Sequence, residues 1–262
     1  MKFLSKLFFV SLLSIVAVFS DNFQVNASEN YPMEDEQDID EKLLEYGYPQ
    51  RLIDELSNIS KRDILNDGIT EYAGAKTITY DLNNNIISVD DYTDSNPPIV
   101  LYGQIKGMTV TQTAGRQVVP SSMDEFVLRS DYKWTTNPFF TGTDLIGFAW
   151  DGNKFNAVPN TSSVEVRKNG KVTHSSNNLY SSSFTGVGWA ANLPDFGGPI
   201  VVTSKIRIRE VKTLTGTSQF HSLYTHSLAG IGSMGLNFGV LSVSFTGTKS
   251  NDQRATFIDF NH

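Results

Sequence analysis

The sequence predicts a mainly β protein: an antiparallel β-sandwich, with a β-barrel as the alternative, preceded by a short helical segment. Three observations lead to this prediction. From about residue 75 onward, apolar and polar residues alternate with a period of two, as on strands that bury one face. Thr, Ser, Val and aromatic residues fill these runs, while Gly, Asn and Pro separate them. No helical pattern separates consecutive runs, which favours antiparallel sheets.

The expected strands follow one another closely along the chain. Asn169-Gly170 is the clearest turn between two of them, because both residues tolerate the positive φ of a type I′ hairpin. Asp81–Asn85 is a second expected turn, and Ser175–Ser183 is an expected polar surface loop. The candidate strands are Thr77–Leu82, Ile86–Asp90, Ile99–Ile105, Met108–Thr113, Glu125–Tyr132, Leu145–Trp150, Ser163–Lys168, Lys171–His174, Val201–Val211, Gln219–His226 and Leu236–Thr246.

The first 27 residues have the layout of a secretory signal peptide. Lys2 and Lys6 precede Leu7–Phe19, an uncharged and mostly apolar run. This run is too short to cross a bilayer comfortably, which takes about 20 residues, and Val25-Asn26-Ala27 fits the small-residue cleavage pattern. A retained membrane anchor is the alternative. We therefore expect a secreted, extracellular protein with no transmembrane anchor after processing.

The remaining chain divides into three expected parts. Residues 28–37 are an acidic lead segment, residues 38–70 are a short helical segment, and residues 75–262 are the antiparallel β-domain. Three short helices bury little surface alone, so the helical segment should pack on the β-domain or bind a partner.

Helical spacing and helix-end signals define the helical segment. Ile39 and Leu43 recur at helical spacing, and Pro49 can open a second helix. Ser60 and Asp63 have the spacing of a capping box before a third helix.

Within this segment, Leu43–Leu65 carries Leu44, Gly47-Tyr48-Pro49, Ile53, Leu56 and Lys61–Leu65. This pattern resembles the helical lead segment of uncharacterised secreted proteins of Gram-positive bacilli. The resemblance implies export from a bacterium and brings no known chemistry.

Composition excludes several kinds of site. The chain has no cysteine, which excludes disulfides, zinc–thiolate sites and cysteine nucleophiles, and in a secreted protein favours a bacterial source. Its 28 acidic residues outnumber its 21 basic ones, so no nucleic-acid partner is expected. No metal is expected, because His221 and His226 would point to opposite faces of a strand. No cofactor is expected either: Gly230–Gly235 matches a dinucleotide fingerprint but precedes a strand pattern rather than a helix.

Aromatic residues are the first candidate binding groups. Trp134 and Trp150 lie in a stretch dense in aromatic rings, and Trp189 follows in a glycine-rich stretch. Exposed, these rings would stack on the apolar faces of sugars. The alternative is that they form the sandwich core, since aromatic side chains bury large areas there.

A cationic stripe is the second candidate. In Val201–Val211 the alternation places Val202, Ile206 and Ile208 on one face and Lys205, Arg207 and Arg209 on the other. The stripe would attract an anionic polymer such as a teichoic acid. Its alternative role is a solvated or protective charged face.

Paired acids are the main catalytic alternative. Asp144 and Asp151 flank the aromatic strand Leu145–Trp150, and a glycosidase needs two acids facing each other across a cleft. A membrane-active role is a further alternative, because Gly232–Gly247 is uncharged and rich in glycine and serine. Its alternation changes parity after Val240, so a bulged strand buried on both faces is the preferred interpretation there.

Together these observations predict a secreted, non-catalytic β-domain that binds a cell-surface or environmental glycopolymer, such as a cell-wall or extracellular polysaccharide. The alternatives are a secreted hydrolase that uses paired carboxylates, and a secreted interaction or membrane-active, toxin-type protein.

Overall fold

The computed structural model describes one compact unit within Asp35–His262. The described residues are 36–81, 83, 85–92, 99–100, 107–120, 122–134, 142–195, 198–226, 235–239, 241–246 and 252–262. The expected signal peptide, most of the acidic lead segment, residues 101–105 and the glycine motif before Gly235 lie outside these residues.

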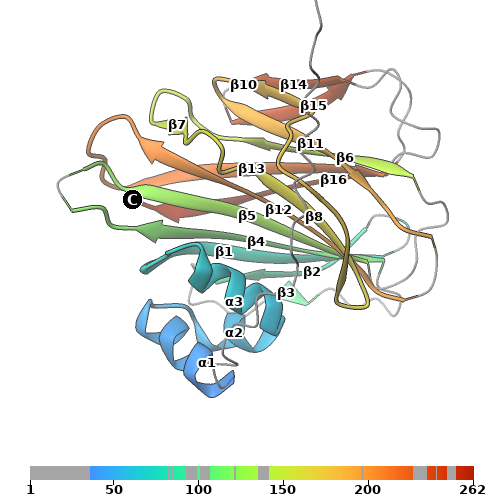
Figure 1. Ribbon diagram of the computed structural model, residues 1–262, viewed down its shortest axis with the longest axis horizontal. Helices are drawn as coiled ribbons and strands as arrows, with labels where there is room; N and C mark the ends of the chain where they lie inside the picture. Colours follow the sequence, from blue (N-terminus) through green and yellow to red (C-terminus); the bar gives the residue numbers. More distant parts are fainter. Residues whose placement is uncertain are drawn as a thin grey trace, which may run out of the picture. The chain divides into compact units, whose positions relative to one another are not determined.

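Two antiparallel sheets form the body of the described chain, and they are open sheets that pack as a sandwich (Figure 1). The predicted sandwich is therefore confirmed, in place of the barrel alternative. The larger sheet has nine strands in the order β3-β2-β1-β4-β5-β12-β8-β9, with β7 paired to β12 off this path. Its strands are β1 (Glu71–Tyr80), β2 (Ile86–Asp91), β3 (Ile99–Val100), β4 (Met108–Gln117), β5 (Glu125–Trp134), β7 (Phe155–Ala157), β8 (Ser163–Lys168), β9 (Lys171–Ser176) and β12 (Ile200–Glu210).

The smaller sheet has five strands in the order β10-β11-β6-β13-β16. They are β6 (Thr143–Ala149), β10 (Ser181–Ser183), β11 (Gly186–Asn192), β13 (Thr217–His226) and β16 (Asp252–Asn261). At one side the two sheets meet where β16 packs against β1. Gly74 allows this approach, because a Cβ at position 74 would overlap the carbonyl oxygen of Asp259.

The core between the sheets is apolar and rich in aromatic rings. Phe148 makes edge-to-face contacts with Trp189 and Phe220, with ring centroids 4.8 and 4.7 Å apart. Phe126 contacts Phe155 edge to face and Phe260 at a tilted angle, with ring centroids 5.7 and 5.3 Å apart. These rings come from both sheets, so their burial holds the sandwich together.

The helical segment covers the outer face of the larger sheet (Figure 1). It consists of α1 (Glu36–Glu45), α2 (Gln50–Glu55) and α3 (Asn58–Asn66). Its apolar side chains, which include Leu43, Leu52 and Ile53, pack with Ala75, Tyr92 and Val127 of the sheet into a second core cluster. Short helices are marginal alone, and this cluster supplies the packing they need.

Local turns follow the sequence signals closely. Asn169 and Gly170 have φ angles of 52° and 77°, as a type I′ hairpin requires. Asp81 accepts hydrogen bonds from the backbone N–H groups of Asn83 and Asn85, each at 2.8 Å, which fixes the second expected turn. Gly68 ends the helical segment with a φ of 70°.

The expected strand Leu236–Thr246 is instead a hairpin. β14 (Gly235–Gly239) and β15 (Ser242–Thr246) pair with each other as a separate two-stranded sheet. Leu241 lies in the turn with a φ of 54°. The parity change after Val240 thus reflects a reversal of chain direction rather than a bulge, and the interpretation of one strand buried on both faces is wrong.

Candidate functional site

The three tryptophans are buried. Trp150 and Trp189 have no exposed surface, and 5% of Trp134 is exposed. All three belong to the core cluster between the sheets. The expectation that they form an exposed stacking platform is therefore wrong, because in-and-out alternation on β5 and β11 turns Trp134 and Trp189 inward with the other core rings. The core alternative is the observed one.

The cationic stripe lies on one face of β12, as its alternation predicts, but it faces carboxylates of the same chain. Lys205 forms an ion pair with Asp67, which caps the C-terminal end of α3. Arg207 pairs with Glu125 at 2.9 Å, and Arg209 also pairs with Glu125. Only the Arg209 side chain keeps half of its surface exposed.

Glu125 lies between these two arginines, beside β12 on the neighbouring strand β5. Burial opposes ionisation of its carboxyl group, but hydrogen bonds from Arg209 and Arg207 outweigh that effect and lower the pKa of Glu125. The carboxylate therefore stays charged and neutralises much of the stripe. A surface that would attract an anionic polymer is in large part satisfied within the chain.

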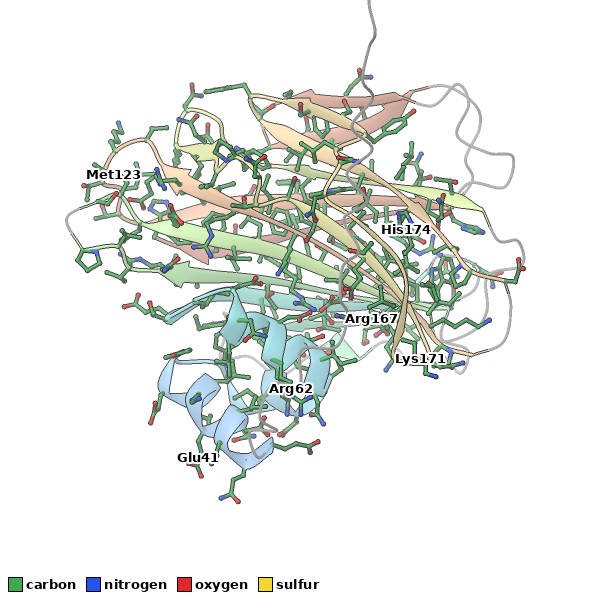
Figure 2. The ribbon with its side chains drawn as sticks, in the orientation of Figure 1. Glu41, Arg62, Met123, Arg167, Lys171 and His174 are labelled. Carbon is green, nitrogen blue, oxygen red and sulfur yellow. The ribbon has the colours of Figure 1, made fainter. Side chains whose placement is uncertain are left out.

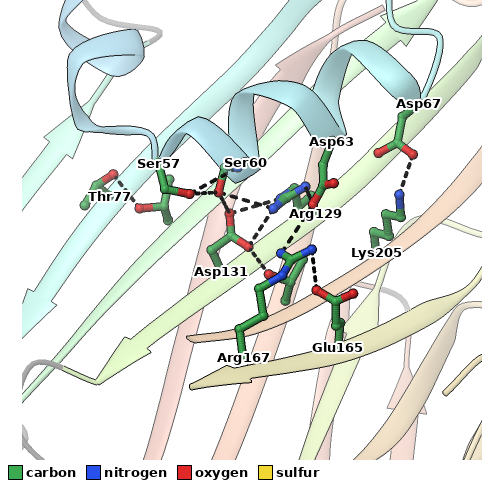
Figure 3. Close-up of polar contacts among 12 residues, drawn as sticks. Ser57, Ser60, Asp63, Asp67, Thr77, Arg129, Asp131, Glu165, Arg167 and Lys205 are labelled. Carbon is green, nitrogen blue, oxygen red and sulfur yellow. Dashed lines mark hydrogen bonds and ion pairs between the residues drawn. The ribbon is translucent and has the colours of Figure 1, made fainter. Parts of the chain in front are cut away.

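A buried ionic network continues from the stripe beneath α3 (Figure 3). Arg129 of β5 binds Asp131 through two nitrogens, at 3.0 and 3.1 Å, and donates to Asp63 of α3 at 3.2 Å. Arg129 is 2% exposed. Burial alone would favour its neutral form, yet the charges of Asp131 and Asp63 raise its pKa further. Arg167 of β8 approaches the same Asp63 at 3.5 Å.

The positions of Ser60, Asp63 and Asp67 along α3 explain how one helix reaches this network. They recur at helical spacing, so they share the face turned to the sheet. Ser57, not Ser60, caps the helix: its side chain accepts the backbone N–H of Ser60 at 3.1 Å. The predicted capping box is therefore wrong by one turn, and Ser60 and Asp63 serve as docking groups instead.

Asp144 and Asp151 do not form a catalytic pair. Asp144 is fully buried, accepts a hydrogen bond from the Tyr224 hydroxyl group and contacts His226 Nδ1 at 2.9 Å. Asp151 lies beyond the other end of β6 and accepts the backbone N–H of Asn153 at 2.9 Å. Strand rise over the five steps from Asp144 to Ala149 alone spans about 17 Å, whereas glycosidase acids stand roughly 5–10 Å apart. This pair cannot carry the hydrolase alternative.

The buried carboxylate of Asp144 instead organises a polar cluster inside the sandwich. Tyr224 also accepts a hydrogen bond from the Trp134 indole N–H at 3.2 Å. Burial, followed by the charge of Asp144, raises the pKa of Tyr224 well above its usual value. The tyrosine hydroxyl therefore remains a donor to the carboxylate. Within the described part of the chain, no three His, Cys, Asp or Glu side chains gather as metal ligands.

An exposed segment at the edge of the sandwich is the candidate site that the sequence did not single out. We call residues 177–185 the edge segment. It starts after β9, an edge strand of the larger sheet. It contains β10, an edge strand of the smaller sheet, and ends in the turn between β10 and β11. Figure 2 shows Lys171 and His174 along β9, the strand that leads into it.

The edge segment presents apolar and aromatic side chains among hydroxyl and amide groups. Phe184 is 63% exposed, Tyr180 39% and Leu179 38%. The ring of Phe184 lies on Gly152, where any side chain would collide with it. The backbone N–H of Tyr180 donates to the Gly188 carbonyl oxygen at 2.8 Å. The Phe184 ring therefore lies against Gly152, and the backbone of Tyr180 is fixed to β11, while much of the surface of both side chains stays open.

The polar composition of the edge segment is the reason that the sequence did not mark it as a candidate site. Its serines and asparagines predict a surface loop over Ser175–Ser183, but β9 runs to Ser176 and Ser181–Ser183 form β10, so only residues 177–180 are a loop. The surface part of the prediction agrees with the exposure of Asn177, Asn178, Ser182 and Ser183. The signal that could have marked it is the pair of aromatic residues, Tyr180 and Phe184, inside an otherwise hydrophilic stretch.

Comparisons with known proteins give structural matches of low sequence identity and low TM-score. No protein-family model matches the chain, and no curated protein matches it. Among solved structures, a collagen-binding domain from a Staphylococcus aureus adhesin aligns over 56% of this chain and 93% of its own, with 6% identity and a TM-score of 0.32. Collagen adhesin from S. aureus covers 72% and 84%, with 7% identity and a TM-score of 0.29.

A third solved structure, AvmM, is described as catalysing macrocyclisation in alchivemycin A biosynthesis. It covers 57% of this chain and 87% of its own, with 13% identity and a TM-score of 0.25. Similarities of this size carry no argument about what the chain binds or does. Among the described helices, none has the length and apolar character needed to cross a bilayer.

Proposed function

We propose that this chain is an exported bacterial binding protein without catalytic activity, that its ligand is a cell-surface or environmental glycopolymer, and that the edge segment is its ligand surface. The observation that carries the proposal is the exposure of Phe184 and Tyr180 on a segment otherwise made of hydroxyl and amide side chains. Export rests on the signal-peptide pattern of residues 1–27.

The chemistry of the edge segment suits a neutral sugar polymer. Exposed aromatic rings can cover the apolar faces of sugars, and the neighbouring Ser and Asn side chains can exchange hydrogen bonds with hydroxyl groups. Tyr, Ser and Asn are also the residues that adaptable binding surfaces favour, because rigid rings supply contact area at a small entropy cost. The edge segment carries no charged side chain, so its binding should not depend on ion pairing.

The placement of the charged side chains supports a binding role rather than hydrolysis. The acids proposed for catalysis are far apart, and Asp144 lies in the core. The cations of the stripe are engaged with Asp67 and Glu125. The exposed aromatic, hydroxyl and amide side chains of the edge segment are therefore the groups best placed to bind a ligand.

The test is co-sedimentation of the chain from Ser28 to His262 with purified bacterial wall and with insoluble polysaccharides, at low and high salt. We expect binding that survives high salt and falls about tenfold in Phe184→Ala or Tyr180→Ala, equivalent to the loss of one good contact of about 1.4 kcal/mol. Phe257→Ala is the matched control, because Phe257 is a 45% exposed phenylalanine on β16.

Two results would overturn the proposal. One is the absence of binding to any of these polymers at either salt concentration. The other is binding that disappears at high salt and is insensitive to Phe184→Ala, which would assign the contact to the partly exposed Arg209 and an anionic polymer instead.

A further inference from the structure

A row of polar side chains crosses the inner face of the larger sheet. Gln112 of β4 lies opposite Ser130 of β5, and Ser130 lies opposite Ser204 of β12. Figure 1 shows these three strands as neighbours in the middle of the sheet. Side chains two positions away along each strand share this face, and they are the core residues Val110, Ala114, Leu128, Tyr132, Val202 and Ile206. Gln112, Ser130 and Ser204 therefore point between the sheets, and we call them the polar row.

The polar row is buried, and its polar atoms have no partner in the part of the chain that the structure describes. Gln112 is 1% exposed, while Ser130 and Ser204 have no exposed surface. Neither the amide nitrogen nor the amide oxygen of Gln112 forms a hydrogen bond with a described residue, and the same is true of the two serine hydroxyl groups. Folded proteins pair nearly all buried polar groups, because an unpaired one loses its bonds to water without replacement. Four such atoms on three adjacent strands therefore indicate a partner other than a side chain.

The smaller sheet presents hydroxyl groups on its own inner face. Ser222 of β13 and Thr256 of β16 lie opposite each other and are 1% and 5% exposed. Their side-chain oxygens share a hydrogen bond of 2.9 Å. They lie on the same face as Phe220, Tyr224 and Ile258 of the core. Both hydroxyl groups therefore point toward the larger sheet.

Tyr132 brings the hydroxyl groups of the two sheets together. It follows Ser130 by two positions on β5, so its ring shares the inner face of the larger sheet. Burial raises the pKa of Tyr132, and the hydroxyl groups of Ser222 and Ser130 partly oppose that rise. One serine from each sheet thus lies near the Tyr132 hydroxyl oxygen, although that oxygen forms no hydrogen bond with a described residue. Polar groups of both sheets meet in one region of an otherwise apolar core.

The chemistry of these groups suits water rather than an ion. The six side chains are all uncharged: Gln112, Ser130, Tyr132, Ser204, Ser222 and Thr256. Hydroxyl and amide side chains both donate and accept hydrogen bonds, whereas an anion would need donors alone and a cation acceptors alone. An ion would also find no compensating charge among these six side chains. A buried water molecule typically makes about three hydrogen bonds to polar groups that would otherwise be unpaired.

We propose that the polar row is a binding site for buried water, and that this water links the two sheets through hydrogen bonds. From the larger sheet the water is held by the polar row and Tyr132, and from the smaller sheet by Ser222 and Thr256. A hydrogen bond mediated by water is nearly as favourable as a direct one. The site lies inside the sandwich, so it goes beyond the ligand surface proposed for the edge segment and does not depend on it.

The first test is a crystal structure of the unmodified chain, at a resolution that shows ordered water. We expect at least one water oxygen between the sheets, at about 2.7–3.2 Å from a polar atom of the polar row and from the hydroxyl oxygen of Ser222 or Tyr132. Direct pairing of the six side chains with one another, with no water among them, would overturn the proposal. This measurement uses no variant, so it does not depend on a variant's ability to fold.

The second test is the sign of a change in stability. Ser204→Ala removes a hydroxyl group that binds the water, so we expect the midpoint of thermal unfolding to fall by about 3–6 °C. A dry, unpaired hydroxyl group predicts a rise instead, because its removal also removes the cost of desolvating it. Ser175→Ala is the matched control: Ser175 is an exposed serine on β9 of the same sheet, and its loss should move the midpoint by no more than about 1–2 °C.

Gln112→Met repeats this test with a side chain of similar size. A substitution that conserves volume leaves little cavity, while both polar atoms of the amide are lost. We expect the midpoint to fall by about 3–6 °C again, since the water loses a donor and an acceptor. Midpoints above that of the unmodified chain in both Ser204→Ala and Gln112→Met would show that the polar row is dry, and the proposal would then be wrong.

Discussion

Arg129 and Asp131 lie two positions apart on β5, so their side chains share the sheet face beneath α3 and form a paired interaction at 3.0 and 3.1 Å. Asp131 also accepts hydrogen bonds from Thr203 at 2.6 Å and from Ser60 at 3.3 Å. A buried charge with several partners contributes less to net stability than its contacts suggest, but removing one partner leaves the other charge uncompensated.

The first prediction follows from that asymmetry. Arg129→Leu should lower the free energy of unfolding by about 3–5 kcal/mol, because Asp131 and Asp63 would lose their buried counter-charge. Arg209→Leu should change it by no more than about 1 kcal/mol, since half of the Arg209 side chain is already in water. Urea unfolding followed by circular dichroism measures both. Equal effects of the two substitutions would contradict the network.

The second prediction concerns the tryptophans. Because Trp134, Trp150 and Trp189 are all buried, the emission maximum of the folded protein should lie at short wavelength. Iodide, a quencher dissolved in the water, should reduce this fluorescence very little. Unfolding in urea should shift the emission to longer wavelength and restore quenching. Trp189→Ala should cost about 3–5 kcal/mol of stability, as large aromatic truncations in cores do. Strong iodide quenching of the folded chain would argue that at least one ring is exposed.

The third prediction separates Asp144, near the start of β6, from Asp151, which lies beyond its end. Asp144→Asn should lower the free energy of unfolding by about 1.5–3 kcal/mol, because the buried Tyr224 hydroxyl group would lose the charged carboxylate to which it donates a hydrogen bond. Asp151→Asn should change it by less than about 0.5 kcal/mol, since an amide oxygen can still accept the Asn153 N–H group. Thermal unfolding curves recorded in parallel would compare the two variants.

The fourth prediction is a pH dependence centred on His221. Its ring stacks on Phe257, with centroids 5.4 Å apart, and burial lowers its pKa below the usual 6.5, although the charge of Asp259 partly opposes the shift. The folded state therefore binds the proton less readily than the unfolded chain. The contribution of the neutral ring is fully present above about pH 6.5 and is lost as the pH falls toward the lower pKa of the folded state.

Comparison with His221→Gln isolates this effect from other titrating groups. The difference in unfolding free energy between the unmodified chain and the variant should favour the unmodified chain less at about pH 5.5 than at about pH 7.5. Urea titrations at the two pH values give the difference directly. A difference that stays constant, or that grows toward acid pH, would be inconsistent with the lowered pKa.

Short-range patterns in the sequence predicted much of the fold. Ser163–Lys168 was predicted with its observed bounds, and the Asn169-Gly170 turn was predicted with its backbone geometry. Both depend on alternation and on local φ preferences, which adjacent residues determine. β7, β10, β11 and β16 were not predicted: β7 and β10 have three residues each, and small residues in β10 and β11 weaken the alternation.

The site was less predictable, because it depends on which face of a strand is buried and on partners that are far away in the sequence. Alternation placed Lys205, Arg207 and Arg209 on one face correctly, but nothing local indicates that Asp67 and Glu125 would meet them there. Side chains on the inward and outward faces of a strand recur with the same period of two. Alternation alone therefore could not tell that the tryptophans are buried; that depends on how the second sheet packs.

The ion pair between Asp67 and Lys205 joins positions 138 residues apart in the chain. A ribosome therefore makes the whole helical segment, and most of the larger sheet, before the strand that receives α3 exists. Contacts between distant positions require the closure of long loops and slow folding. Until β12 has been added, Asp67 at the end of α3 lacks its partners Lys205 and Arg207, so the C-terminal end of the helical segment should be among the last parts of the molecule to acquire protection from proteases.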